Sequence, residues 1–247
     1  MEINWEALWQ PESLVALGTL TVLEIILGVD NILFISIISE KLPKEQQPKA
    51  RVVGLALALI FRLALLLMIS WLVHFEEELF RVFEHPFSGR DLILLGGGLF
   101  LLIKTISEIH NKVEGEEEIQ NENGKTKKKA RSFMSVVGMI ILIDMVFSFD
   151  SILTAVGMVD EIIIMIAAVV IAMIIMLIFV NAISRIINRH PSVQILALSF
   201  LILIAFVLIL DGLGKHIERG YVYFALFFSL MVEVLNIKSR KKSKKIN

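Results

Sequence analysis

Long apolar runs are the feature that most restricts the fold of this chain. Its 247 residues are 56% hydrophobic, whereas soluble domains contain about 45–50% apolar residues. Several runs approach the roughly 20 apolar residues that one helix needs to cross a bilayer. We therefore expect an all-α integral membrane protein whose seven transmembrane helices cover residues 14–39, 52–73, 92–109, 133–157, 162–182, 193–213 and 221–237.

The basic residues predict how these helices are oriented. Most of the 24 Lys and Arg side chains fall in alternate connecting segments, and cytoplasmic loops are the ones enriched in such residues. This places the N-terminus outside and the C-terminus inside. The first residues lack the basic segment of a signal peptide, so the first span is expected to be retained. Residues 74–90 are polar enough to hold a short surface helix between spans two and three.

Two spans carry matching polar motifs. Residues 24–34 read EIILGVDNILF, and residues 144–153 read DMVFSFDSIL. In each, an acid is followed by five residues, a second acid, a small oxygen-bearing residue and Ile-Leu. The motifs lie in spans one and four, and the chain crosses the membrane three times from the start of one to the start of the other, so the copies run in opposite directions. That is the expectation for an inverted 3+3 repeat with its site near the midplane, plus a seventh helix.

The repeat divides the chain into four parts. Residues 1–110 form the N-terminal segment and the first three-helix repeat, and residues 132–213 form the second repeat. Between them, residues 111–131 contain an acidic block followed by a basic block, which is typical of a flexible cytoplasmic linker. Residues 214–247 contain the seventh helix and a basic cytoplasmic tail.

The polar residues of the motifs indicate a cation site. An ionisable side chain at the centre of a spanning helix costs roughly 2.5–3.5 kcal/mol, so it usually has a function. Carboxylate, amide and hydroxyl oxygens suit Mg²⁺, Ca²⁺ or Mn²⁺. The chain has no Cys, and none of its five His residues falls in the middle of a span, which disfavours Zn²⁺ and Cu⁺. Gly28 and Ser148 lie between the paired acids, where either could permit local unwinding. The candidate metal ligands are Glu24, Asp30, Asn31, Asp144, Asp150 and Ser151.

A structural role for these acids is the alternative. Buried acids can pair with buried bases and serve assembly alone, and Arg62 and Lys104 are available for such pairs. Asp211 lies near the outer end of span six, where it could reach water. Glu233, in span seven, is a candidate for coupling to the site.

Enzyme signatures are missing from the sequence. It contains no Walker A loop, no HExxH and no GxSxG. We expect neither an enzyme nor a tightly bound cofactor, and no nucleic-acid partner. The expected partners are a divalent cation and the lipid bilayer, with the oligomeric state left open. Transport would then be driven by a gradient or by the membrane potential.

The two motifs, together with GGGLFLLIKTISEIH and GYVYFALFFSLMVEVLN, resemble the TerC family of integral membrane proteins. The resemblance implies a multi-pass protein of the bacterial inner membrane that is linked to manganese export and related to the LysE-type exporters. It also implies that the six candidate ligands form the metal site. The expected function is therefore export of divalent cations, Mn²⁺ before others. The alternatives are a Ca²⁺ transporter and a non-transporting scaffold that assists assembly or metal loading of other proteins.

Overall fold

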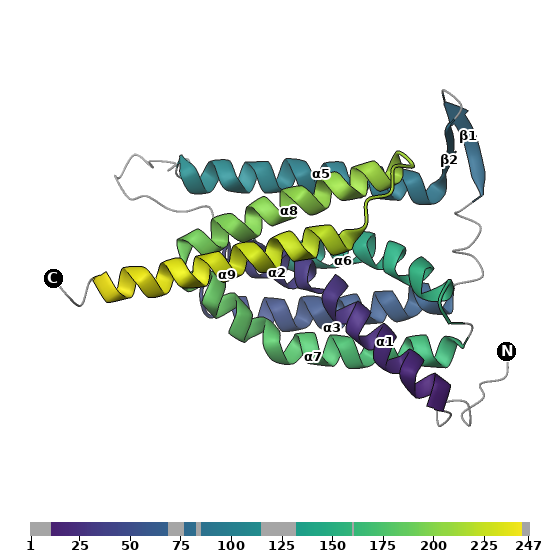
Figure 1. Ribbon diagram of the computed structural model, residues 1–247, viewed down its shortest axis with the longest axis horizontal. Helices are drawn as coiled ribbons and strands as arrows, with labels where there is room; N and C mark the ends of the chain where they lie inside the picture. Colours follow the sequence, from purple (N-terminus) through teal and green to yellow (C-terminus); the bar gives the residue numbers. More distant parts are fainter. Residues whose placement is uncertain (1–10, 69–76, 83–84, 115–131, 160, 244–247) are drawn as a thin grey trace.

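Long apolar helices lying side by side make up the computed structural model (Figure 1). The structure describes residues 11–68, 77–82, 85–114, 132–159 and 161–243. Its elements are α1 (Pro11–Leu27), α2 (Val29–Ser39), α3 (Gln47–Leu67), β1 (Glu78–Val82), β2 (His85–Ser88), α5 (Gly89–Val113), α6 (Phe133–Val156), α7 (Ile162–Arg189), α8 (Pro191–Gly212) and α9 (Arg219–Ser243).

The prediction of seven membrane-spanning helices is confirmed. Seven helical segments of the described chain are long and apolar enough to cross a bilayer, and α1 and α2 together form the first of them. Most boundaries lie within a few residues of the predicted ones. The second and fifth spans differ most from the prediction. Helix α3 ends at Leu67, and residues 69–76 lie outside the described residues, whereas α7 continues past the predicted end of its span to Arg189. The linker predicted over residues 111–131 also lies mostly outside them, and its first residues belong to α5.

The surface helix predicted within residues 74–90 is wrong for the residues that the structure describes there. Strands β1 and β2 form an antiparallel hairpin instead. Phe80 and Phe87 stack across it, with ring centroids 5.5 Å apart, and such cross-strand aromatic pairs stabilise hairpins. Pro86 has no N–H for a helix interior. In β1, hydrogen bonds from Arg81 lower the pKa of the Glu78 carboxyl.

Ser88 ends the hairpin and begins the next helix. Its hydroxyl accepts a hydrogen bond from the backbone N–H of Asp91, and the Asp91 carboxylate accepts one from the backbone N–H of Ser88. This reciprocal capping box fixes the first turn of α5. It thereby sets the position of Arg90, which lies between the two capping residues.

Helices from the two halves of the chain pack against each other in exchanged pairs. Helix α1 packs on α7 and α6 packs on α3, while α5 packs on α8. An inverted repeat would produce these pairs, since corresponding helices exchange partners across a two-fold axis. The repeat itself, and the orientation in the membrane, stay predictions.

The two ends of the bundle differ. The first turn of α1 and the β1–β2 hairpin lie at one end, here called the hairpin end, whereas α5 and α9 terminate at the opposite end (Figure 1). Buried apolar side chains fill the space between the helices in two clusters. Helix α9 packs mainly on α8 and leaves Tyr221, Phe224 and Phe227 largely exposed, as expected for a helix that faces lipid.

Candidate functional site

Gly28 interrupts the first span between the two acids of its motif. Helix α1 ends at Leu27 and α2 begins at Val29, so Glu24 and Asp30 lie on different helices. A Cβ atom at Gly28 would collide with the sulfur of Met176, which explains why a glycine fits there. The corresponding position of the second motif, Ser148, lies inside the continuous helix α6. The expectation of a discontinuity is therefore met in the first motif only.

Arg62 joins the two motifs at the centre of the bundle. Its Nη1 donates to Glu24 Oε2, and its Nη2 donates to Asp144 Oδ1 at 3.1 Å. All three side chains are at most 2% exposed. Glu24 and Asp144, which occupy matching positions of the two motifs, are thus linked by a guanidinium placed between them. A second cross-motif contact is the hydrogen bond that Asn31 Nδ2 donates to Asp144 Oδ1 at 3.0 Å.

Asp30, the second acid of the first motif, is buried and forms no ion pair with any described residue. It is 2% exposed, and its Oδ1 has no hydrogen-bond partner. It lies in the first turn of α2, where the partial positive charge of a helix N-terminus favours a carboxylate. Arg62 and Arg219 are both within electrostatic range of it. Asp30 therefore lies between the central ion pair and a second charged group nearer the hairpin end.

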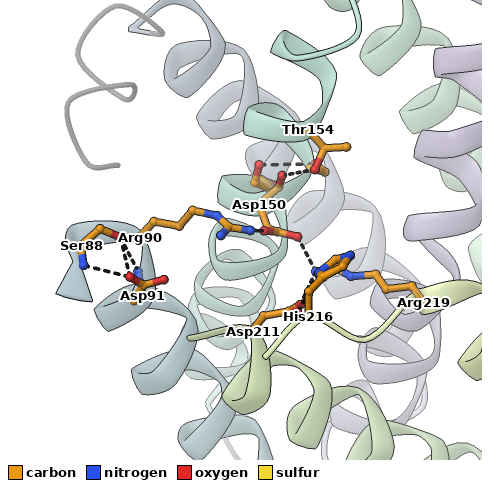
Figure 2. Close-up of polar contacts among 10 residues, drawn as sticks. Ser88, Arg90, Asp91, Asp150, Thr154, Asp211, His216 and Arg219 are labelled. Atoms are coloured by element: carbon orange, nitrogen blue, oxygen red, sulfur yellow. Dashed lines mark hydrogen bonds and ion pairs between the residues drawn. The ribbon is translucent and has the colours of Figure 1, made fainter. Parts of the chain in front are cut away.

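That second group surrounds Asp150 (Figure 2). The two carboxylate oxygens of Asp150 accept hydrogen bonds from different arginines, Arg90 at the start of α5 and Arg219 at the start of α9. Arg219 also approaches Asp211, with 3.8 Å between Nη2 and Oδ2, and His216 Nδ1 lies 3.1 Å from Asp211 Oδ1. This group, here called the hairpin-end network, ties α5, α6, α8 and α9 together.

The structure thus separates the predicted ligands into two neighbouring groups. Ser151 belongs to neither, because its hydroxyl donates to the backbone oxygen of Ser148 within α6. Asp211, expected to reach water, is only 6% exposed. No three His, Cys, Asp or Glu side chains within the described ranges are arranged to hold a metal ion. The six-residue metal site accordingly stays a prediction.

Two functional candidates, Arg90 and Arg219, do not stand out in the sequence. Both precede apolar runs, where they resemble ordinary loop charges. A usable signal is their place just before two predicted spans, at the same end of the bundle as the second acid of the α6 motif. Arg62 was named as available for pairing, and the structure shows it paired with both motifs.

These observations define a class: a polytopic helical membrane protein with buried, partly compensated carboxylates on paired motifs. Residues 9–245 match the family described as "Integral membrane protein TerC family", and the chain belongs to that family.

Among its relatives is the Escherichia coli (strain K12) protein named "UPF0053 inner membrane protein YgdQ". The two are 49% identical over 233 residues, which cover 94% of this chain and 96% of that protein. The Escherichia coli (strain K12) protein named "UPF0053 inner membrane protein YoaE" is 48% identical over 96% of this chain, but over only 45% of its own length. No solved structure matches the chain. The relatives' names and the seven apolar helices make this a multi-pass protein of the bacterial inner membrane.

Proposed function

We propose that this protein exports divalent metal cations, Mn²⁺ before others, through the buried carboxylates of its two motifs. The charge of the central group carries the proposal. Glu24, Asp30 and Asp144 supply three carboxylates. Among the described residues, Arg62 is the one guanidinium that contacts any of them, through its ion pairs with Glu24 and Asp144. Arg219 is within electrostatic range of Asp30 but is already paired with Asp150. With all three acids ionised, two negative charges remain uncompensated at a depth where each is costly. One dication would neutralise them.

Unsatisfied oxygens in the same region support a cation as the ligand. Glu24 Oε1, Asp30 Oδ1 and Asn31 Oδ1 are buried and have no hydrogen-bond partner in the described part of the chain. All three come from residues that flank the Gly28 interruption. Carboxylate and amide oxygens are ligands for Mg²⁺, Ca²⁺ and Mn²⁺. The choice of Mn²⁺ among these, and of export as the direction, rests on the family resemblance.

Arg62 would act as a counter-charge that the transported cation displaces. In the structure it occupies the space between Glu24 and Asp144. A dication bound to these carboxylates would compete with the guanidinium, because both satisfy the same oxygens. When the cation leaves, Arg62 would recover both acids and keep them from remaining unpaired in a medium of low dielectric constant.

The hairpin-end network would close the predicted outer side of the site. Asp150 cannot bind a cation with both oxygens while Arg90 and Arg219 occupy them. Because these arginines start α5 and α9, a shift of either helix would release Asp150. Alternating access would therefore require these ion pairs to open and close in each cycle.

Cell-associated manganese tests this proposal. An exporter-deficient bacterial strain loaded with Mn²⁺ would carry empty vector, wild type, Asp30→Asn, Asp150→Asn or Glu12→Gln, at matched membrane levels. Glu12 is an exposed carboxylate in the first turn of α1 and serves as the control. We expect wild type and Glu12→Gln to lower manganese and both Asp variants to fail. If wild type leaves manganese at the empty-vector level, Mn²⁺ export is wrong.

The extent of ion pairing favours a second candidate, the non-transporting scaffold. Arginines already form ion pairs with Glu24, Asp144 and Asp150, as a purely structural network would require. A scaffold that folds and inserts should tolerate Asp30→Asn, since that acid has no ion pair to lose.

Measuring total calcium in the same samples separates Mn²⁺ export from Ca²⁺ transport.

A further inference from the structure

A large basic cavity lies at the end of the bundle opposite the hairpin. Its volume is about 1090 Å³, and it is lined by residues from the α2–α3 connection, the start of α3 and the C-terminal parts of α5 and α7. Neither Asp30 nor any other candidate cation ligand of the two motifs lines it. The cavity is therefore separate from the proposed transport site.

Its lining carries more positive than negative charge. Two ion pairs cancel part of it: Lys41 Nζ lies 2.5 Å from Glu108 Oε2, and Lys112 Nζ lies 2.9 Å from Glu40 Oε2. No salt bridge to an acid of the described chain compensates the other four cations. These are Lys44, Arg51, Arg185 and Arg189. A dication would be repelled by such a lining, whereas an anion would be attracted.

Arg51 shows that this charge is built into the fold. It is 4% exposed, although it carries a permanent charge. Its guanidinium donates to neutral acceptors, with Nε 2.7 Å from Ser39 Oγ, Nη2 3.2 Å from Gln47 Oε1 and Nη1 3.4 Å from Asn181 Oδ1. Glu40 is within electrostatic range but is paired with Lys112. These neutral partners orient the Arg51 guanidinium without cancelling its positive charge, which can therefore attract an anion in the cavity.

Membrane topology alone does not account for this arrangement. Basic residues gather at cytoplasmic ends, and those in the last turn of a helix such as α7 also complement its dipole. Those rules place charges on exposed positions, as for Arg185 and Arg189. Arg51 is buried and lies near the N-terminus of α3, where the dipole disfavours a cation.

We propose that this cavity binds a phosphate-bearing anion, which Arg51, Arg185 and Arg189 hold through charge-assisted hydrogen bonds. Guanidinium groups bind phosphate oxygens in a planar, two-pronged manner. The phosphate belongs either to an anionic lipid headgroup or to a soluble phosphate compound, and both present the same oxygens to the arginines. Basic pockets between membrane helices bind anionic headgroups in this way.

Thermal unfolding of the delipidated full-length chain in neutral detergent tests this site. The probes are inorganic pyrophosphate and dihexanoyl phosphatidylglycerol, each compared with chloride at equal ionic strength. Dihexanoyl phosphatidylcholine controls for the acyl chains. The variants are Arg51→Gln and the double variant Arg185→Gln/Arg189→Gln. Lys49→Gln is the control, since Lys49 is exposed near the start of α3 and does not line the cavity.

We expect at least one anionic probe to raise the Tm of wild type and Lys49→Gln by about 3 °C or more. Both cavity variants should lose at least half of that rise, and the double variant decides if Arg51→Gln does not fold. A rise with phosphatidylglycerol alone assigns the site to a lipid headgroup, and a rise with pyrophosphate alone assigns it to a soluble phosphate. The proposal is overturned if neither probe exceeds chloride, or if the cavity variants respond like wild type.

Discussion

At the scale of single residues, Arg62 is the side chain on which the two motifs depend. It holds Glu24 and Asp144, one acid from each motif, and all three are buried. Removing one partner of a buried ion pair destabilises a protein more than replacing the whole pair by apolar residues, because it leaves a buried charge without compensation. The motifs are therefore coupled through a residue that belongs to neither.

Replacing this residue should destabilise the protein strongly. We expect Arg62→Gln to cost about 3–5 kcal/mol, since it leaves two carboxylates unpaired. For a chain of this size that corresponds to a fall in Tm on the order of 10 °C. Arg81→Gln, at an exposed ion pair of the hairpin, should leave Tm unchanged. Equal unfolding temperatures for the two variants, measured in the same detergent, would contradict the role given to Arg62.

The sequence contains enough information to find the acids and one of their partners, Arg62, but not Arg90 and Arg219. Acids at matching positions of two apolar spans predict that Glu24 and Asp144 come together, and they do so through Arg62. The positions of the Arg90 and Arg219 guanidinium groups depend on where α5 and α9 begin relative to α6. That placement is set by tertiary packing. Long flexible side chains reach partners that spacing along one helix does not specify.

At the scale of elements, the contact between α5 and α8 depends on small residues. A Cβ at Gly98 would lie 2.8 Å from Ile209 Cγ1 and 3.0 Å from the backbone oxygen of Ala205, both on α8. At Gly96, two residues earlier, nothing lies within 4 Å. Glycines allow membrane helices to approach closely, but within one cluster only those that face a neighbour do so.

These two glycines should respond in opposite ways to the same substitution. Gly98→Ala forces the backbones of α5 and α8 apart and should destabilise the protein by about 1–3 kcal/mol. Gly96→Ala faces open space and should be neutral, or stabilising by up to about 1 kcal/mol, because alanine favours helices. Tm values of the two variants decide the matter. A fall for Gly96→Ala as large as for Gly98→Ala would show that the interface is not the cause.

Apolar periodicity and length predict the helices well, because every span must satisfy its backbone hydrogen bonds internally. They predict the polar connections poorly. The hairpin over β1 and β2 depends on the stacking of Phe80 on Phe87, a contact that composition does not reveal. The sequence indicates that either Gly28 or Ser148 could permit unwinding, and the structure has a one-residue interruption at Gly28 and a continuous helix at Ser148.

At the scale of the whole molecule, the two ends of the bundle are expected to face different compartments. The hairpin end should face the periplasm and the basic cavity the cytoplasm. The chain contains no Cys, so single cysteines can be introduced without a prior deletion. Lys215, in the connection between α8 and α9, and Lys49, near the start of α3, are both exposed. The α8–α9 connection adjoins the hairpin-end network, whereas the start of α3 lines the basic cavity at the opposite end.

Cysteine labelling tests this orientation. A membrane-impermeant maleimide should label Lys215→Cys in intact cells with a permeabilised outer membrane. Lys49→Cys should react only after the inner membrane is broken, because its side chain is on the cytoplasmic side. Labelling of both before disruption would indicate a leaky preparation, and the reverse order would mean that the chain is inserted with its N-terminus inside.

Mn²⁺ flux into proteoliposomes tests the central claim most directly. Purified wild type, Asp30→Asn and Glu12→Gln would be reconstituted at equal density, with a Mn²⁺-sensitive dye inside. We predict flux for wild type and Glu12→Gln, and at least a tenfold loss for Asp30→Asn, which corresponds to about 1.4 kcal/mol. If Asp30→Asn carries Mn²⁺ as fast as wild type, or if wild type carries no more than protein-free liposomes, the buried carboxylates are not a Mn²⁺ transport site.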